Sequence, residues 1–176
     1  MAVSKIIGVL GLGAIGGVIA KDLAKNYKGK IVYIVRNRKS VKDLAKKYRV
    51  DVREADVSKV NSLVKALKGI DVVIHAVHHE FNMNVMKACL KTKTNYIDLG
   101  GLYHYTKKQL KLNNKFKKAN LTAIIGMGAA PGITNILAKH ASKFLDEVDD
   151  IEIKLGYADF STYKQESPLS SSYSIQ

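Results

Sequence analysis

A glycine-rich turn near the start of the chain limits the fold more than any other feature. The apolar run 6–10, typical of a buried parallel strand, leads directly into the spacing G-x-G-x-x-G, formed by Gly11, Gly13 and Gly16. A helical pattern of apolar residues begins at Ile15. In this context the first glycine permits a tight turn, the second leaves room for a pyrophosphate, and the third lets the helix pack closely. The turn therefore predicts a dinucleotide site at a helix N-terminus.

Strand and helix patterns alternate after this turn. Apolar or alternating runs predict strands at 6–10, 31–35, 50–55, 72–77, 96–99 and 121–125. Helical spacing predicts one helix after the glycine turn, one capped by Ser40 with Asp43 in the capping box, and others at 58–69, 81–90, 105–119 and 133–145. This alternation predicts an α/β fold: a doubly wound parallel Rossmann sheet of order 3-2-1-4-5-6, with helices on both faces.

The pattern changes near the end of the chain. Residues 150–157 alternate apolar and polar, as in a strand, and a polar, serine-rich stretch follows them. That stretch is too short and too polar to make a packed domain. We therefore interpret 1–148 as a dinucleotide-binding domain and 149–176 as the first strand and linker of an absent substrate domain.

Composition excludes several classes of protein. The chain has 176 residues, 47% of them hydrophobic, and contains no apolar run long enough to cross a membrane. Its start lacks the pattern of a signal peptide. Cys89 is the single cysteine, so no internal disulfide is expected. We expect a soluble, cytoplasmic protein with no membrane partner.

The net charge of +14 has two interpretations. It could mark a nucleic-acid partner. However, the lysines are scattered over most predicted helices without interleaved aromatic residues, and the densest run, 107–118, is typical of a solvated helix face. We therefore expect no nucleic-acid partner, although the positive field would attract a multiply charged cofactor.

The end of the second strand indicates the type of cofactor. A site specific for NAD usually has an acidic residue there, which binds the ribose hydroxyls. Here the chain has Arg36, Asn37 and Arg38. A guanidinium can bind a 2′-phosphate in a bidentate manner and can stack on the adenine. The sequence therefore favours NADP, with NAD not excluded; a solvated basic turn is the alternative.

Residues at the ends of the third and fourth strands extend the predicted site. Asp56 and Val57 follow the third strand and are expected beside the adenine, although an ordinary loop acid would fit the same pattern. Ala76, Val77 and His78 are expected to lead past the phosphates toward the nicotinamide. The neighbouring histidines have no acidic or thiolate partner at a metal-binding spacing, so we expect no metal, and a plain surface histidine is an equal alternative for His78.

Small residues follow the fifth and sixth strands. Asp98 lies directly before Leu99-Gly100-Gly101. A carboxylate at this strand end could bind a substrate amine or orient the nicotinamide, and it could equally cap the next turn. The loop 126–132 contains small residues and leads into a helix, so its backbone could approach the nicotinamide ring.

Together these motifs resemble the saccharopine dehydrogenase (saccharopine reductase) family. In order they are the glycine fingerprint, FN after the fourth strand, NYIDLGG at the fifth strand and IIGMGAAPGITNILA from the sixth strand onward. Within the family, the lysine 6-dehydrogenase branch is similar at 98–101 and 130–135. The final residues, SPLSSSYSIQ, resemble the stretch where family members enter their substrate and dimerisation domain. Two features depart from the family: this chain stops where that domain should be built, and Arg36 stands where many relatives have an acid.

The resemblance implies a dehydrogenase that acts on the C–N bond of a lysine- or saccharopine-like amino acid. Hydride would pass between the carbon that bears nitrogen and nicotinamide C4, and an imine would form and be hydrolysed. Cofactor roles are implied for Gly11, Gly13, Ala14, Ile15, Gly16 and Arg36. A role on the nicotinamide side is implied for Asp98, Gly100 and Gly128. No residue is assigned the proton transfer, and a homodimer is left open.

The sequence is also compatible with two other classes of function. The chain could be a stand-alone NADP-binding regulatory module without catalysis, which its length of 176 residues would suit. It could also be a nucleic-acid-binding protein that uses its charge. We favour the cofactor-binding part of an oxidoreductase, and we expect the 176 residues to be inactive by themselves because no residues remain to enclose a substrate.

Overall fold

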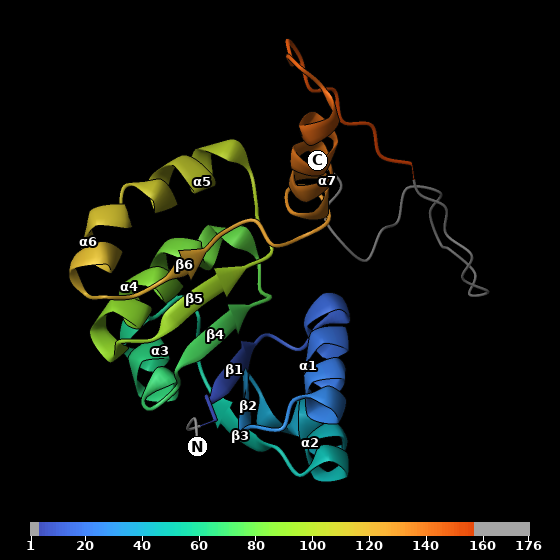
Figure 1. The fold of residues 1–176 in the computed structure, drawn as a ribbon. Helices are drawn as coiled ribbons and strands as arrows, with labels where there is room; N and C mark the ends of the chain where they lie inside the picture. Colours follow the sequence, from blue (N-terminus) through green and yellow to red (C-terminus); the bar gives the residue numbers. More distant parts are fainter. Residues whose placement is uncertain (1–3, 157–176) are drawn as a thin grey trace, which may run out of the picture.

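Six parallel strands form one sheet in the computed structural model, which describes residues 4–156 (Figure 1). The strands are β1 (Ile7–Leu10), β2 (Ile31–Val35), β3 (Asp51–Glu54), β4 (Val72–His75), β5 (Asn95–Asp98) and β6 (Ala123–Ile124). They lie in the order β3-β2-β1-β4-β5-β6, and every neighbouring pair is parallel. The predicted α/β fold and its strand order are confirmed.

Helices cover both faces of the sheet (Figure 1). One face carries α1 (Ala14–Asn26) and α2 (Lys42–Tyr48). The other carries α3 (Val60–Leu67), α4 (Asn82–Thr92), α5 (Tyr103–Leu110) and α6 (Asn113–Lys118). Because successive strand residues point to opposite faces, Val9 is buried in the first core while Leu10 is buried in the second. The last helix, α7 (Ile133–Ala141), projects away from the sheet.

Two helices differ from the sequence prediction. Ser40 does not cap the second helix. Instead Asn37 caps the 3₁₀ turn η1 (Arg38–Val41), because its Oδ1 accepts a hydrogen bond from Lys39 N at 2.9 Å. Ser40 lies inside this turn, and its hydroxyl donates to the Asn37 carbonyl at 2.7 Å. The single helix expected over 105–119 is two helices, α5 and α6. The chain turns between them, and α6 packs Phe116 into the core.

The end of the described chain also differs. The helix expected over 133–145 ends at Ala141 and is followed by the 3₁₀ turn η3 (Ser142–Phe144). Residues 150–156 form no strand, although a strand was expected over 150–157; Tyr157 itself lies outside the described residues. Alternating apolar residues predict an extended chain, but a strand also needs a neighbour to pair with, and residues 4–156 supply none there. The division of the chain at 148 stays a prediction.

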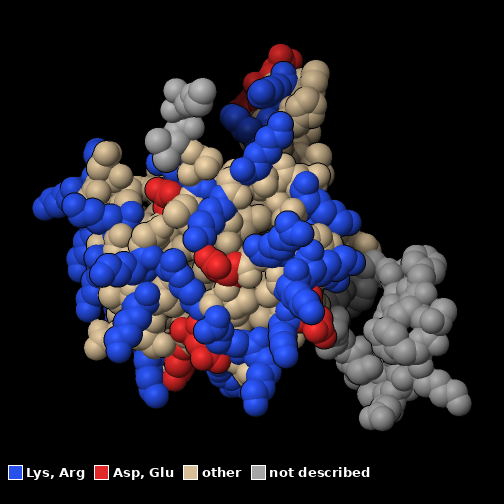
Figure 2. Space-filling view, turned by 90° about the horizontal axis from the view of Figure 1, so that it is seen from below, with Lys and Arg blue, Asp and Glu red and all other residues tan. Residues whose placement is uncertain are grey.

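Basic side chains are distributed over the surface. Seen from below, Lys and Arg cover the face in Figure 2, with acidic and uncharged residues between them, and no single basic stripe stands out. None of the helices within residues 4–156 has the length and apolar character needed to cross a membrane.

Candidate dinucleotide-binding site

The glycine turn has the geometry that a pyrophosphate requires. Gly11 adopts a φ of +86°, and a Cβ on Gly16 would collide with the Gly11 carbonyl oxygen, so α1 starts directly against the turn. Gly13 faces open space, with no atom within 4 Å of the position a Cβ would take. No side chain caps the N-terminus of α1. Ala14 and Ile15, in the first turn of α1, are exposed residues, and the positive helix end therefore fits an anion at this point.

A cavity of about 690 Å³ continues from this turn across the ends of β1, β2 and β3. Its volume lies in the range of cofactor and ligand sites. The predicted residues that line it are Gly11, Gly13, Arg36, Asn37, Asp56, Val57 and Val77. The other predicted cofactor residues lie outside the lining. Arg38 donates its backbone N to Glu54 Oε1 at 3.1 Å, and Ala76 N donates to the Leu10 carbonyl at 2.8 Å. Also outside are Ala14, Ile15 and Gly16 in the first turn of α1, and Gly128 after β6. Arg36 follows β2, is exposed and lines the cavity, so its guanidinium can reach a 2′-phosphate bound there.

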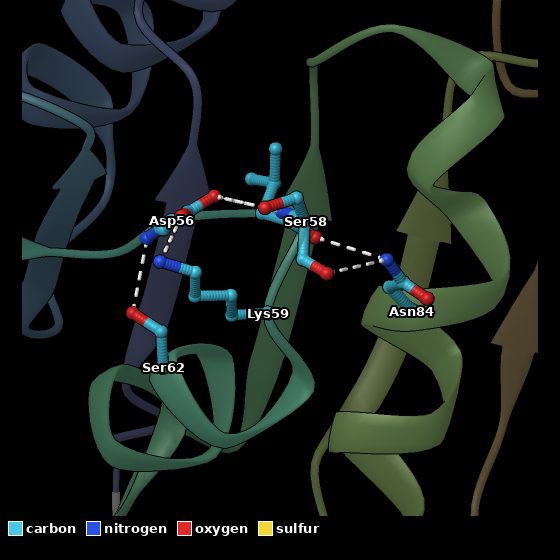
Figure 3. Close-up of polar contacts among 6 residues, drawn as sticks. Asp56, Ser58, Lys59, Ser62 and Asn84 are labelled. Carbon is cyan, nitrogen blue, oxygen red and sulfur yellow. Dashed lines mark hydrogen bonds and ion pairs between the residues drawn. The ribbon is translucent and has the colours of Figure 1, made fainter.

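A network of polar contacts holds the loop after β3 (Figure 3). Asp56 Oδ1 accepts from the Ser58 backbone N at 3.0 Å and from its hydroxyl at 2.6 Å, and Asp56 Oδ2 lies 3.3 Å from Lys59 Nζ. The Ser58 bonds and the Lys59 charge hold the pKa of the Asp56 carboxyl below its usual range. The Asp56 backbone N in turn donates to Ser62 Oγ at 3.0 Å. Asp56 therefore holds the conformation of the loop 56–59, and residues 56–58 of this loop form part of the cavity wall.

Asn84 ties this loop to the opposite half of the sheet, and the sequence prediction missed it. Its Nδ2 on α4 donates to the carbonyls of Val57 and Ser58, both at 3.2 Å (Figure 3). The two partners are 27 and 26 residues away in sequence. An asparagine in the first turn of a helix has no spacing signal that identifies such a contact, because its partners are backbone atoms.

The Asp98 carboxylate is buried, and both of its oxygens accept hydrogen bonds. Its Oδ1 accepts from Gly100 N at 2.9 Å and Gly126 N at 2.8 Å. Its Oδ2 accepts from the Tyr96 hydroxyl at 2.8 Å, Gln109 Nε2 at 2.6 Å and, at 3.3 Å, the side-chain amide of Asn82. Burial and the neighbouring carboxylate raise the pKa of Tyr96, which keeps its hydroxyl a donor. The geometry favours the turn-capping alternative for Asp98: it fixes the backbone after β5 and β6 from inside the molecule.

The loops after β5 and β6 pack against each other at the carboxyl end of the sheet. A Cβ on Gly100, whose φ is +100°, would lie 2.8 Å from Pro131 Cγ, and a Cβ on Gly128 would collide with the Leu99 carbonyl. Gly128 N donates to the Pro131 carbonyl at 2.9 Å, while Met127 N donates to the Asp98 carbonyl at 2.8 Å. The predicted residues Gly100 and Gly128 thus lie together, beside the end of β5.

Comparison with known families decides the class of protein. The saccharopine dehydrogenase NADP-binding domain model matches residues 7–124. The chain belongs to this family. Its cofactor is accordingly NADP, as the basic turn at Arg36 predicts, and the resemblance drawn from the motifs is confirmed.

Individual relatives of this saccharopine dehydrogenase-type domain are longer than the chain. It is 28% identical over 172 residues to carboxynorspermidine synthase of Vibrio cholerae, covering 82% of this chain and 41% of that protein. It is 29% identical over 145 residues to the NADP-dependent, L-glutamate-forming saccharopine dehydrogenase of Saccharomyces cerevisiae, covering 82% of this chain and 31% of that protein. The apo structure of a yeast saccharopine dehydrogenase superposes with a TM-score of 0.71 at 26% identity, covering 80% of this chain and 31% of that one. The chain thus spans about two fifths or less of these relatives.

Histidines lie at the β4 end of this saccharopine dehydrogenase-type domain. His75, the last residue of β4, is buried, and neither of its ring nitrogens has a hydrogen-bond partner within the described chain. Burial lowers the pKa of His75 to about 4, so the ring is neutral at pH 7. His78 is exposed: its Nδ1 accepts from Glu80 N at 3.5 Å and caps the 3₁₀ turn η2 (His79–Phe81). Over residues 4–156, no three His, Cys, Asp or Glu side chains are arranged to hold a metal ion.

Proposed function

We propose that this domain serves an oxidoreductase that transfers hydride between NADP and the carbon of a C–N bond in a lysine- or saccharopine-like amino acid. The observation that carries the proposal is the continuous cavity from Gly13 to Arg36, within a domain of the saccharopine dehydrogenase NADP-binding family. The names of its relatives agree with this class of substrate: a carboxynorspermidine synthase, a saccharopine dehydrogenase and a carboxyaminopropylagmatine dehydrogenase.

The residues of the chain would bind and orient the cofactor. The turn at Gly13 and the N-terminus of α1 would hold the pyrophosphate, and Arg36 the 2′-phosphate. The loop at Asp56 would form the adenine wall, and the loops at Gly100 and Gly128 would form the backbone beside the nicotinamide. The bound cofactor would supply or accept the hydride at nicotinamide C4.

We infer that the wall facing the substrate comes from outside residues 4–156. Beyond the nicotinamide end, α7 and the segment 144–155 expose large apolar side chains, including Ile136 at 61% and Phe144 at 76%. A groove of about 490 Å³ runs between α7 and that segment and is lined mostly by aliphatic residues. Exposed apolar surfaces of this extent are typical of interaction sites. A further domain or a second chain that packed on this surface would exclude water from the reacting carbon of the substrate. The described residues by themselves do not enclose that carbon.

The phosphate turn provides the test of cofactor binding. Gly13→Asp would place a side chain and a negative charge where the pyrophosphate lies, so we expect NADP binding to be lost while the circular dichroism spectrum is kept. Gly156→Asp is the matched control, because it adds the same side chain in open space away from the cavity. A Gly13→Asp variant that bound NADP as well as the parent would contradict the proposed site.

A second measurement tests the reaction. The purified chain, mixed with NADP and either lysine or saccharopine, is expected to bind cofactor without forming NADPH, which is followed by its absorbance. Turnover of these amines would support the C–N reaction and would contradict the expectation that the 176 residues are inactive by themselves. Turnover of a secondary alcohol in the absence of amine turnover would contradict the proposed reaction class.

A further inference from the structure

Three histidines and a tyrosine from two separate elements form a row of rings where β4 and β5 end. We call His78, His79 and His104 the histidine cluster. The ring centroids of His78 and His79 are 4.1 Å apart, and His79 meets the edge of Tyr105 at 4.8 Å. Tyr105 lies 4.3 Å from His104 on α5. Residues after β4 and residues after β5 thus form one continuous row of rings.

A glycine makes the room for this row. A Cβ on Gly101 would lie 2.7 Å from His79 Cβ and 3.0 Å from its Cγ, closer than packed side chains allow. Any other residue at this position would force His79 or the backbone beside it to shift. The second glycine of NYIDLGG therefore seats an imidazole against the start of α5.

The charges around the cluster favour an anion. Lys108 Nζ lies 5.6 Å from the Tyr105 ring and Lys107 Nζ lies 6.0 Å from the Tyr103 ring. The acid facing the rings is Glu80, with Oε1 3.8 Å from His78 Nδ1. Burial, with the neighbouring imidazoles, lowers the pKa of His79, while Glu80 opposes the shift. His78 and His104 thus disfavour protonation of His79, and a carboxylate placed beside the His79 ring would offset that repulsion.

The cluster adjoins the nicotinamide end of the cofactor cavity. Val77 and Phe81, the residues on either side of 78–80, both line that cavity. Arg36 follows β2, which lies on the other side of β1 from β4 and β5. In open α/β sheets the ligand lies across the carboxyl ends of the strands, so a cofactor bound at Gly13 extends its nicotinamide toward β4 and β5.

We propose that the histidine cluster is a carboxylate-binding subsite for the ligand that meets the nicotinamide; that this ligand is an amino acid rests on the function proposed above. His79 and His104 would donate ring N–H groups to one carboxylate, and His78, whose Nδ1 accepts in the cap of η2, would offer its Nε2–H. The ligand class is accordingly a small molecule with at least one carboxylate, bound with uptake of a proton by the cluster.

Nuclear magnetic resonance of the histidine rings tests this subsite with glutarate as the probe. The chain has five histidines, so each ring signal can be followed. In the NADP-loaded protein, glutarate is expected to shift the His79 and His104 signals with one shared dissociation constant and to raise their measured pKa. The controls are internal: His75 is buried and His140 stacks on Phe144 at the far end of α7. Propylamine, a cation, is expected to shift none of the five.

Variants distinguish glutarate binding at the histidine cluster from nonspecific attraction of glutarate to the basic surface. His79→Gln combined with His104→Gln should weaken glutarate binding by about tenfold or more, and His140→Gln should leave it unchanged. NADP affinity should stay within about twofold in all three proteins, which also reports that they fold. Equal shifts at His140, no shift at His79 up to about 50 mM glutarate, or unchanged binding by the double variant would overturn the subsite. If NADP failed to bind but glutarate still moved His79 and His104 in the free protein, the cofactor proposal would fail and the subsite would stand.

Discussion

At the scale of single residues, Arg36 carries the choice of cofactor. We expect Arg36→Asp to reverse the preference from NADP toward NAD, because one bidentate phosphate contact is lost and a repulsion is added. The change should be about 2–4 kcal/mol in the ratio of the two affinities. Lys21→Asp makes the same change of charge at an exposed position of α1 outside the cavity and should leave the ratio as it is. An unchanged ratio in Arg36→Asp would mean that its guanidinium does not reach the phosphate.

His75 makes stability depend on pH. Its pKa in the folded chain is about 4, below the ordinary value of 6.5, so above pH 6.5 the ring is neutral in both states. As the pH falls from 6.5 toward 4, the unfolded chain takes up a proton that the folded chain does not, and the free energy of unfolding decreases. We expect His75→Leu to reduce the loss of stability between about pH 7 and about pH 4.5 by about 2–3 kcal/mol in denaturant unfolding. His140→Leu, at an exposed site, is the control, and equal pH dependence in the parent and His75→Leu would refute this account.

At the scale of elements, α4 positions the adenine wall through Asn84. Removal of its two hydrogen bonds in Asn84→Ala should free the loop at Val57 and Ser58 and raise the dissociation constant of NADP by roughly fivefold to thirtyfold, at about 1 kcal/mol for each bond. The ratio of NADP to NAD affinity should not change, because Arg36 is untouched. Asn61→Ala, an exposed asparagine on α3, should bind like the parent. A changed ratio, or an unchanged affinity, would show that this tether does not shape the site.

The elements also show what a sequence can and cannot predict. Buried apolar runs such as 31–35 and the spacing at Gly11, Gly13 and Gly16 depend on local patterns, so the sheet, its order and the phosphate turn could be predicted. The break between α5 and α6 could not, because it accompanies the packing of Phe116 into a core built from residues distant in the sequence. Nor could the burial of Asp98, whose donors come from α4, α5 and the loop after β6. Contacts to distant backbone atoms leave no periodic signal in the chain.

At the scale of the whole molecule, basic side chains cover much of the surface, and a segment rich in acidic residues follows α7. Lys and Arg side chains cover the body of the domain, as Figure 2 shows for one face, while Asp146, Glu147, Asp149, Asp150 and Glu152 follow α7 closely in the chain. The exposed apolar side chains of α7 lie beside this acidic segment. The basic body suits an anionic cofactor, and the α7 projection suits contact with another body.

Calorimetric titration of the parent chain with NADP and, separately, with NAD is the decisive measurement for the cofactor site. We expect saturable binding of one NADP per chain, with a dissociation constant about tenfold or more below that of NAD. The absence of saturable NADP binding, or NAD binding as tight as or tighter than NADP binding, would contradict the assigned site.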